Sequence, residues 1–418
     1  MSLLDLPTES LLLIIQNCED EKDISSFVQT NSLLYNLLSD YLYQKYARRH
    51  NSSALQWAAE YGLPRVALRS LSNGVCVKHR SSSSHTPLYL AVGNGNEELV
   101  RILLAHGANT NHLCPPPDWK VPFETALMKA ASAGHDVIVQ MLLDHGAPID
   151  PHRSDGKNPL CLAAEAGRLS TVKLLITRGA NPKLPRSNLG NTPLALAVSH
   201  GYPEIVELLI QNGAMVRHPN VEGNTLLSDA VEKQHWETAK VLLQNGAKVD
   251  KRNSHGLSAL DKAAMSNSIA GARLLIDHGA QVNSDSSFGG TPLFAAARRG
   301  YEDMARLLIN NGADINALSE VVPRAYEQLP EYEKLRDLSL RRGADSDCAL
   351  SFPVTPLLMA AANGHEAMCR LLIDNGAEVN YETLMGVTPG CLAEAYGYHE
   401  IKSLIEKANS GQGLKSTA

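Results

Sequence analysis

Apolar residues recur along most of the chain in a pattern of paired short helices. In one copy, Ile205, Val206, Leu208 and Leu209 follow the spacing of a helix with one buried face. A shorter apolar segment precedes it and opens with Thr192 and a proline. The threonine hydroxyl can accept an orphan backbone N–H, and proline presets φ for the first helical position. A Gly-Ala pair then ends the second helix, so the pattern predicts a helix–turn–helix followed by a hairpin loop.

This unit repeats along the chain. Its opening string, typified by TPLxxA, begins at Thr86, Thr125, Asn158, Thr192, Thr225, Ser258, Thr291, Thr355 and Thr388. Most steps are 33 or 34 residues, with exceptions of 39 and 64, and the Gly-Ala pairs run in phase. A period of 33 with TPLxxA resembles the ankyrin repeat over residues 53–407. The resemblance implies an all-α solenoid of about 11 units, in which each unit buries its apolar face against its neighbours.

One departure from the family pattern recurs: the histidine that usually follows TPL is absent from every copy. We expect apolar packing to replace its hydrogen bonds at some joints. The polar replacements Ser228 and Asp261 mark the joints expected to be weakest.

Two segments interrupt the period. The step of 64 contains a degenerate unit at 317–347, which we expect to continue the stack with a distorted first helix. The step of 39 enlarges the hairpin at 112–123, which the three consecutive prolines 115–117 stiffen. Trp119 and Phe123 on this hairpin are candidate interface anchors, or they fold back onto the neighbouring repeat.

Residues 1–50 do not follow the repeat. A Leu-Pro-x-Glu start, a DISSFV middle and a TNSLLYNLLSDYLY end resemble an F-box, in the version found fused to ankyrin repeats in filamentous fungi. The resemblance implies a small helical domain that holds the Skp-type linker of a cullin ubiquitin ligase. Its apolar face would comprise Leu6, Pro7, Leu11, Ile14, Ile15 and Phe27. The alternative is a helical cap that covers the first repeat. At the other end, residues 408–418 are small and polar and predict a disordered tail.

Charge and motifs narrow the function. A net charge of −6 argues against nucleic acid as the main ligand. The seven cysteines are scattered without zinc spacing, which predicts reduced thiols and no metal. There is no secretory signal and no apolar stretch that could span a membrane, so we expect a cytoplasmic or nuclear protein. No GxxxxGK[ST], GxGxxG, HExxH or GxSxG string occurs, so we expect neither catalysis nor a cofactor.

The ankyrin resemblance implies a partner-binding groove lined by the ends of the first helices, together with the hairpin tips. Besides Trp119 and Phe123, the candidates are Tyr61, Asn94, His200, Lys233, Met265, Arg298, Arg299, Asn363 and Tyr396. Arg298 and Arg299 form a basic spot suited to an acidic segment. The leading hypothesis is the substrate-recognition adaptor of an SCF-type ubiquitin ligase, with its target in the groove. The alternatives are a plain scaffold whose N-terminal helices only cap the stack, and an enzyme built on an ankyrin frame.

Overall fold

The computed structural model describes residue 10 and residues 53–78, 85–115, 122–183, 192–217, 223–286, 290–320, 353–383 and 386–410. These belong to two compact units, Met1–Leu196 and Ala197–Ala418. Some predicted residues lie outside the described part of the chain: Leu6, Pro7, Leu11, Ile14, Ile15, Phe27 and Trp119.

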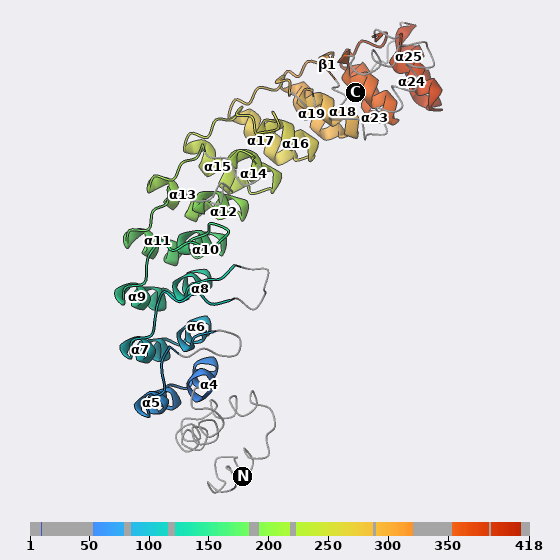
Figure 1. Ribbon diagram of the computed structural model, residues 1–418. Helices are drawn as coiled ribbons and strands as arrows, with labels where there is room; N and C mark the ends of the chain where they lie inside the picture. Colours follow the sequence, from blue (N-terminus) through green and yellow to red (C-terminus); the bar gives the residue numbers. More distant parts are fainter. Residues whose placement is uncertain are drawn as a thin grey trace. The chain divides into compact units, whose positions relative to one another are not determined.

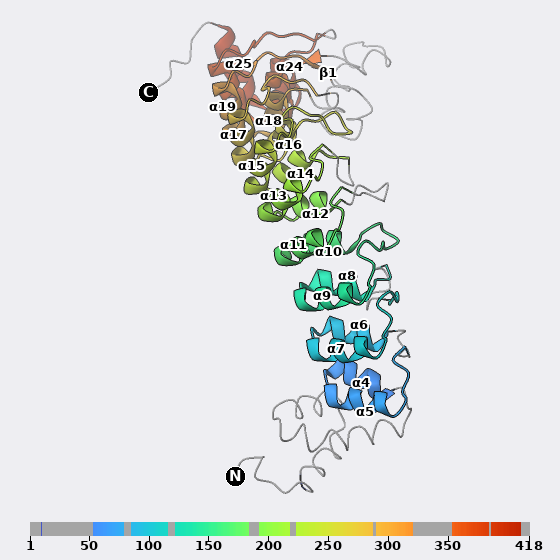
Figure 2. The same cartoon turned by 90° about the vertical axis from the view of Figure 1, so that its left-hand side faces the viewer.

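The first unit is a stack of helix pairs (Figure 1). Its helices are α4 (Ser53–Tyr61), α5 (Pro64–Ser72), α6 (Pro87–Gly93), α7 (Glu97–Ala105), α8 (Ala126–Ala133), α9 (Asp136–Asp144), α10 (Pro159–Glu165) and α11 (Leu169–Thr177). The first helices pack on one another in the order α4, α6, α8, α10, and the second helices pack in the order α5, α7, α9, α11. The unit therefore has two helical layers, which can also be followed in Figure 2.

The second unit repeats this arrangement, and α12 (Pro193–Ser199) includes the boundary. The helices after it are α13 (Pro203–Gln211), α14 (Leu226–Glu232), α15 (Trp236–Gln244), α16 (Ala259–Met265), α17 (Ile269–Asp277), α18 (Pro292–Arg299), α19 (Glu302–Asn310), α22 (Pro356–Asn363), α23 (Glu366–Asp374), α24 (Pro389–Ala395) and α25 (His399–Asn409). The predicted all-α stack is confirmed. The last helix includes Ala408 and Asn409, two residues assigned above to the tail.

Local sequence explains each helix pair. The side chain of Thr86 accepts a hydrogen bond from the backbone N–H of Tyr89, and Thr355 does the same for Leu358. The turn between the two helices needs a left-handed residue, as at Gly134 (φ +83°). A Cβ there would lie 2.8 Å from the side chain of Arg168 in the next repeat, so glycine also permits close stacking. Leucine and alanine are the most frequent residues of the core between the layers, such as the fully buried Leu103 and Ala91.

Repeats that are far apart in sequence are neighbours in the second unit. Helix α18 packs on α22, and α19 packs on α23, as α16 packs on α18 and α17 on α19. His365 Nε2 lies 3.1 Å from the carbonyl oxygen of Arg298, the same kind of contact that His235 makes with Ser199 at 3.2 Å. The repeat that contains α22 therefore follows directly on the repeat that contains α18.

Hydrogen bonds between the hairpin loops show the same order of repeats. Asn283 Oδ1 accepts a hydrogen bond from the backbone N–H of Asp314 in the next repeat, and Asn316 Oδ1 accepts one from Glu378, each at 2.8 Å. The predicted degenerate unit at 317–347 lies almost entirely outside the described residues, whereas the repeats before and after it are in direct contact. The described residues form ten helix pairs, and the remaining predicted unit is the one at 317–347.

A short pair of strands stands where this sequence departs from the period. β1 (Ser319–Glu320) pairs antiparallel with β2 (Pro353–Val354), in the register Ser319↔Val354 and Glu320↔Pro353. The two strands bring the residues on either side of 321–352 together. The strand pair therefore joins the two ends of the segment that lengthens this step of the period.

Candidate protein-binding surface

In the first unit the predicted groove residues lie at the ends of the first helices. The ring of Tyr61, the last residue of α4, contacts that of Trp57 with centroids 5.4 Å apart. Asn94 Nδ2 donates to the carbonyl oxygen of Glu60 at 2.5 Å, which joins its repeat to the preceding one. Asn94 is exposed, so it stabilises the stack and still faces solvent.

In the second unit several predicted residues have bonds within the stack. Lys233 pairs with the buried carboxylate of Asp229 at 3.2 Å and donates to the Ser199 hydroxyl. Asn363 Nδ2 donates to the carbonyl oxygen of Met359 in its own helix at 2.9 Å. Tyr396 is half-buried and packs against the apolar cluster around Leu358 and Phe294. These side chains therefore have structural roles beside any role in binding.

The remaining groove residues are more open. His200 is exposed, and its ring stacks with that of Tyr202 at 6.3 Å between centroids. Arg299 is exposed at the end of α18. Met265 on α16 and Arg298 on α18 are brought together, because both line one small cavity between the two helices.

The enlarged hairpin at 112–123 has a fixed base. Cys114 and Glu124 exchange two backbone hydrogen bonds, of 2.9 and 3.0 Å, as an antiparallel bridge. Both of their side chains are buried, whereas the adjacent Leu113 and Phe123 are 50% and 56% exposed. Since side chains alternate between faces along a strand, the apolar pair lies on the face opposite to the buried pair. The sequence analysis identified Phe123 but missed Leu113, which alternation with Cys114 could have indicated.

A buried polar network holds this base in place. The Tyr89 hydroxyl donates to Glu124 Oε1 at 2.6 Å, and Arg153 Nη1 lies 3.7 Å from Glu124 Oε2. Arg153 also pairs with Asp155 at 2.6 Å. Burial raises the pKa of Tyr89, and the hydrogen bond to Glu124 adds to the rise. Burial of Asp155 works against its ionisation, yet hydrogen bonds from Arg153 and from the Lys157 backbone lower its pKa. The network connects three successive repeats, and the sequence analysis missed it.

Tyr89 occupies the position from which the family's histidine is missing, so one joint retains a polar link there. The other polar replacements bond inside their own repeat. Ser228 is buried and bonds with Thr225, and Asp261 Oδ2 accepts from the N–H and the hydroxyl of Ser258, both at 2.8 Å. Asp261 therefore completes the cap of its own helix, Ser228 bonds with the capping residue of its helix, and neither has a hydrogen bond to the next repeat among those described. That these joints are the weakest remains a prediction.

The described part of the chain contains no group of three or more His, Cys, Asp or Glu that could hold a metal ion. None of the described helices is long and apolar enough to cross a membrane.

Comparison with known families identifies the repeat. The model described as Ankyrin repeats (3 copies) matches residues 26–114, 112–186, 172–253 and 249–319, and the model described as Ankyrin repeat matches 354–384. The chain belongs to the ankyrin repeat family. The matched ranges stop at 319 and resume at 354, which are residues of β1 and β2. The first match begins at residue 26, inside the segment that resembles an F-box.

Two relatives share part of this ankyrin stack. The chain is 33% identical over 135 residues to Ankyrin repeat and KH domain-containing protein mask-1 of Caenorhabditis elegans, which is 32% of this chain and 5% of that protein. It is 35% identical over 112 residues to human Ankyrin repeat and KH domain-containing protein 1, which is 26% of this chain and 4% of that protein. The chain thus spans a small fraction of these relatives. The human ASB11 ankyrin repeat domain aligns over 55% of this chain and 99% of its own, with 26% identity and a TM-score of 0.49.

Membership places the chain among protein–protein interaction modules. The ankyrin repeat is typical of binding scaffolds rather than of enzymes. Its stacked units create an extended surface from hairpins and first helices.

Proposed function

We propose that the chain binds a protein target along its first helices and hairpins. The observation that carries the proposal is the pair Leu113 and Phe123, two large apolar side chains half exposed on a hairpin with a fixed base. The buried bonds of Tyr89 and Arg153 to Glu124 hold that base before any partner arrives. Apolar side chains on a rigid support bind at a low cost in ordering entropy.

The test is affinity purification with cross-linking from cells that express the full chain. Leu113→Asp with Phe123→Asp should lose a defined set of captured proteins. The matched control is Val137→Asp, because Val137 is 46% exposed but lies on α9, in the layer of second helices. If the double variant and the control capture the same proteins as the wild type, the hairpin is not part of the binding surface.

We further propose that the chain is a substrate-recognition adaptor of an SCF-type ubiquitin ligase. This finer function is supported by the sequence of residues 1–50 alone. Its apolar face, led by Leu11 and Ile14, would hold a Skp-type linker protein while the hairpins hold the target.

The adaptor proposal has its own experiment. The purified full chain should bind a recombinant Skp-type linker, and Leu11→Asp with Ile14→Asp should abolish that binding. Leu113→Asp with Phe123→Asp is the control, and it should leave linker binding unchanged. If the wild-type chain does not bind the linker, the adaptor proposal is refuted. The alternative is then a scaffold in which residues 1–50 only cap the stack.

A further inference from the structure

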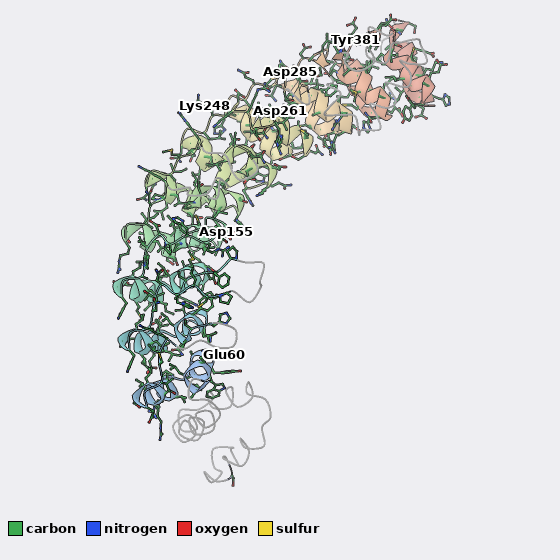
Figure 3. All side chains as sticks on the ribbon, in the orientation of Figure 1. Glu60, Asp155, Lys248, Asp261, Asp285 and Tyr381 are labelled. Carbon is green, nitrogen blue, oxygen red and sulfur yellow. The ribbon has the colours of Figure 1, made fainter. Side chains whose placement is uncertain are left out.

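A small cavity lies between α16 and α18, where Met265 and Arg298 meet in the predicted groove. Its volume is about 20 Å³, which is room for one water-sized group. Asp261 lines this cavity from α16 (Figure 3). Met265, Ala295 and Arg298 also line it, so much of the wall is apolar side chain or methylene stem.

Three of the residues that line the cavity are buried and carry oxygen-bearing side chains. They are Asp261, Ser286 and Thr291, which are 2%, 6% and 5% exposed. Each hydroxyl has one hydrogen bond: Ser286 Oγ donates to the carbonyl of Gly290 at 2.9 Å, and Thr291 Oγ1 accepts from Phe294 N at 3.2 Å. Both hydroxyl oxygens keep a lone pair that can accept a further bond.

The Asp261 carboxylate is incompletely bonded. Oδ2 accepts both bonds from Ser258, whereas Oδ1 is buried and has no hydrogen-bond partner among the described residues. A buried acceptor without a partner costs about 1–3 kcal/mol, and more when it is charged. Burial raises the pKa of Asp261 to about 6 despite the bonds from Ser258, so at neutral pH a carboxylate sits here with too little stabilisation.

The surrounding charges do not fill this need. Arg252 acts to lower the pKa of Asp261, and Asp285, on the loop after α17, acts to raise it (Figure 3). The two effects have opposite sign. Arg298 adds a positive charge to the wall of the cavity, so an entering cation is held by the Asp261 carboxylate against this repulsion.

We propose that this cavity is a binding site for a primary ammonium group, presented by a lysine side chain of the bound partner. An ammonium has three N–H donors, and the cavity offers three acceptor oxygens, one of them negatively charged. The head group matches the size of the cavity, and the methylenes of a lysine would leave along Met265 and Ala295. That a lysine of a protein presents the group rests on the proposed function, whereas the ammonium site itself does not.

The experiment uses n-butylammonium chloride as the probe and the full chain labelled with ¹³C at the methionine methyl groups. The Met265→Leu variant assigns the Met265 resonance, because that signal disappears from its spectrum. Since Met265 lines the cavity, its methyl resonance reports on binding there. We expect a saturable shift of that resonance at millimolar n-butylammonium. Asp261→Asn should weaken the apparent affinity by at least about tenfold, because the charged acceptor is lost.

Two further variants keep the test decisive. Ala295→Leu fills the cavity without touching the carboxylate, and it should also abolish the shift. Asp277→Asn is the matched control, since Asp277 is exposed at the end of α17 and does not line the cavity, and it should bind as the wild type does. The Ala295 variant still decides the question if Asp261→Asn disturbs the fold, which the other methionine resonances would reveal.

Several outcomes would overturn the site. An equal shift with n-butanol would mean an apolar cavity that ignores charge, and an equal shift with potassium chloride would mean an inorganic cation. A linear response without saturation, or binding that survives both Asp261→Asn and Ala295→Leu, would mean that the group binds elsewhere. None of these outcomes bears on Leu113 and Phe123, so the hairpin surface stands or falls separately.

Discussion

The buried carboxylate of Asp261 makes a pH-dependent contribution to stability that can be measured. Its ordinary pKa of 3.8 is raised to about 6 by burial, against the hydrogen bonds from Ser258. Between these values the folded chain holds a proton on Asp261 that the unfolded chain has lost. The stabilising contribution is therefore complete below about pH 4 and is lost as the pH rises through about 6.

The size of the effect follows from the two pKa values. A difference from 3.8 to about 6, at about 1.4 kcal/mol for each pH unit, amounts to about 3 kcal/mol over the whole range. Between pH 5 and pH 8 the linkage relation gives about 1.4 kcal/mol. Asp261→Asn keeps an oxygen that can accept the bonds from Ser258 and removes the titration. The variant should therefore gain about 1.4 kcal/mol relative to the wild type between pH 5 and pH 8.

Urea denaturation followed by the fluorescence of Trp236 suits this measurement, because α15, which carries Trp236, lies close to α17 of the same repeat as Asp261. Trp57→Phe and Trp119→Phe, introduced into both the wild type and the Asp261→Asn variant, leave Trp236 as the single fluorescent reporter. A local reporter is needed because long repeat arrays can unfold in parts. If the difference between variant and wild type is the same at pH 5 and pH 8, Asp261 does not titrate as a buried carboxyl.

The remaining predictions concern other parts of the chain. Tyr89→Phe should destabilise the first unit by about 1–3 kcal/mol in urea denaturation, since it removes a bond to the buried Glu124, and an unchanged midpoint would contradict this role. Replacing residues 321–352 by an Asn-Gly turn between β1 and β2 should leave the urea midpoint of the second unit unchanged, because α18 already packs on α22. A lowered midpoint would refute the direct stack. Iodoacetamide followed by peptide mapping should modify the exposed Cys76 in the native chain and spare Cys161, whose pKa burial raises to about 12, and equal labelling would mean that Cys161 is not enclosed.

The period of the sequence was enough to predict the helix pairs. Threonine or serine caps, proline at the first helical position and glycine at the turns are local signals, and the alternation of two short apolar helices follows from them. The predicted end of the stack at residue 407 lies two residues before the observed end of α25 at Asn409, because small or polar residues do not by themselves stop a helix. These features are set by interactions between residues a few positions apart, so the sequence alone is enough to predict them.

Which repeat packs on which could not be read from the period. A worn Gly-Ala unit at 317–347 matched the spacing, yet α18 packs on α22 and Asn316 bonds with Glu378, sixty-two residues away. Either the unit at 317–347 or the repeat with α22 could have packed against α18. Which of the two apolar faces packs there depends on tertiary contacts, which the period does not contain.

The candidate sites divide in the same way. The sequence by itself determined that the chain is a repeat stack, and it offered Phe123, Met265 and Arg298 as candidate residues of the hairpin and the groove. Only the tertiary structure decided that Met265 and Arg298 share a cavity with Asp261, and that Tyr89 bonds with Glu124. The physical reason is that burial and unsatisfied polar atoms are properties of packed neighbours. In the sequence, Asp261 is a polar residue in place of the family's histidine; in the packed repeat it is a buried carboxylate with one unpaired oxygen.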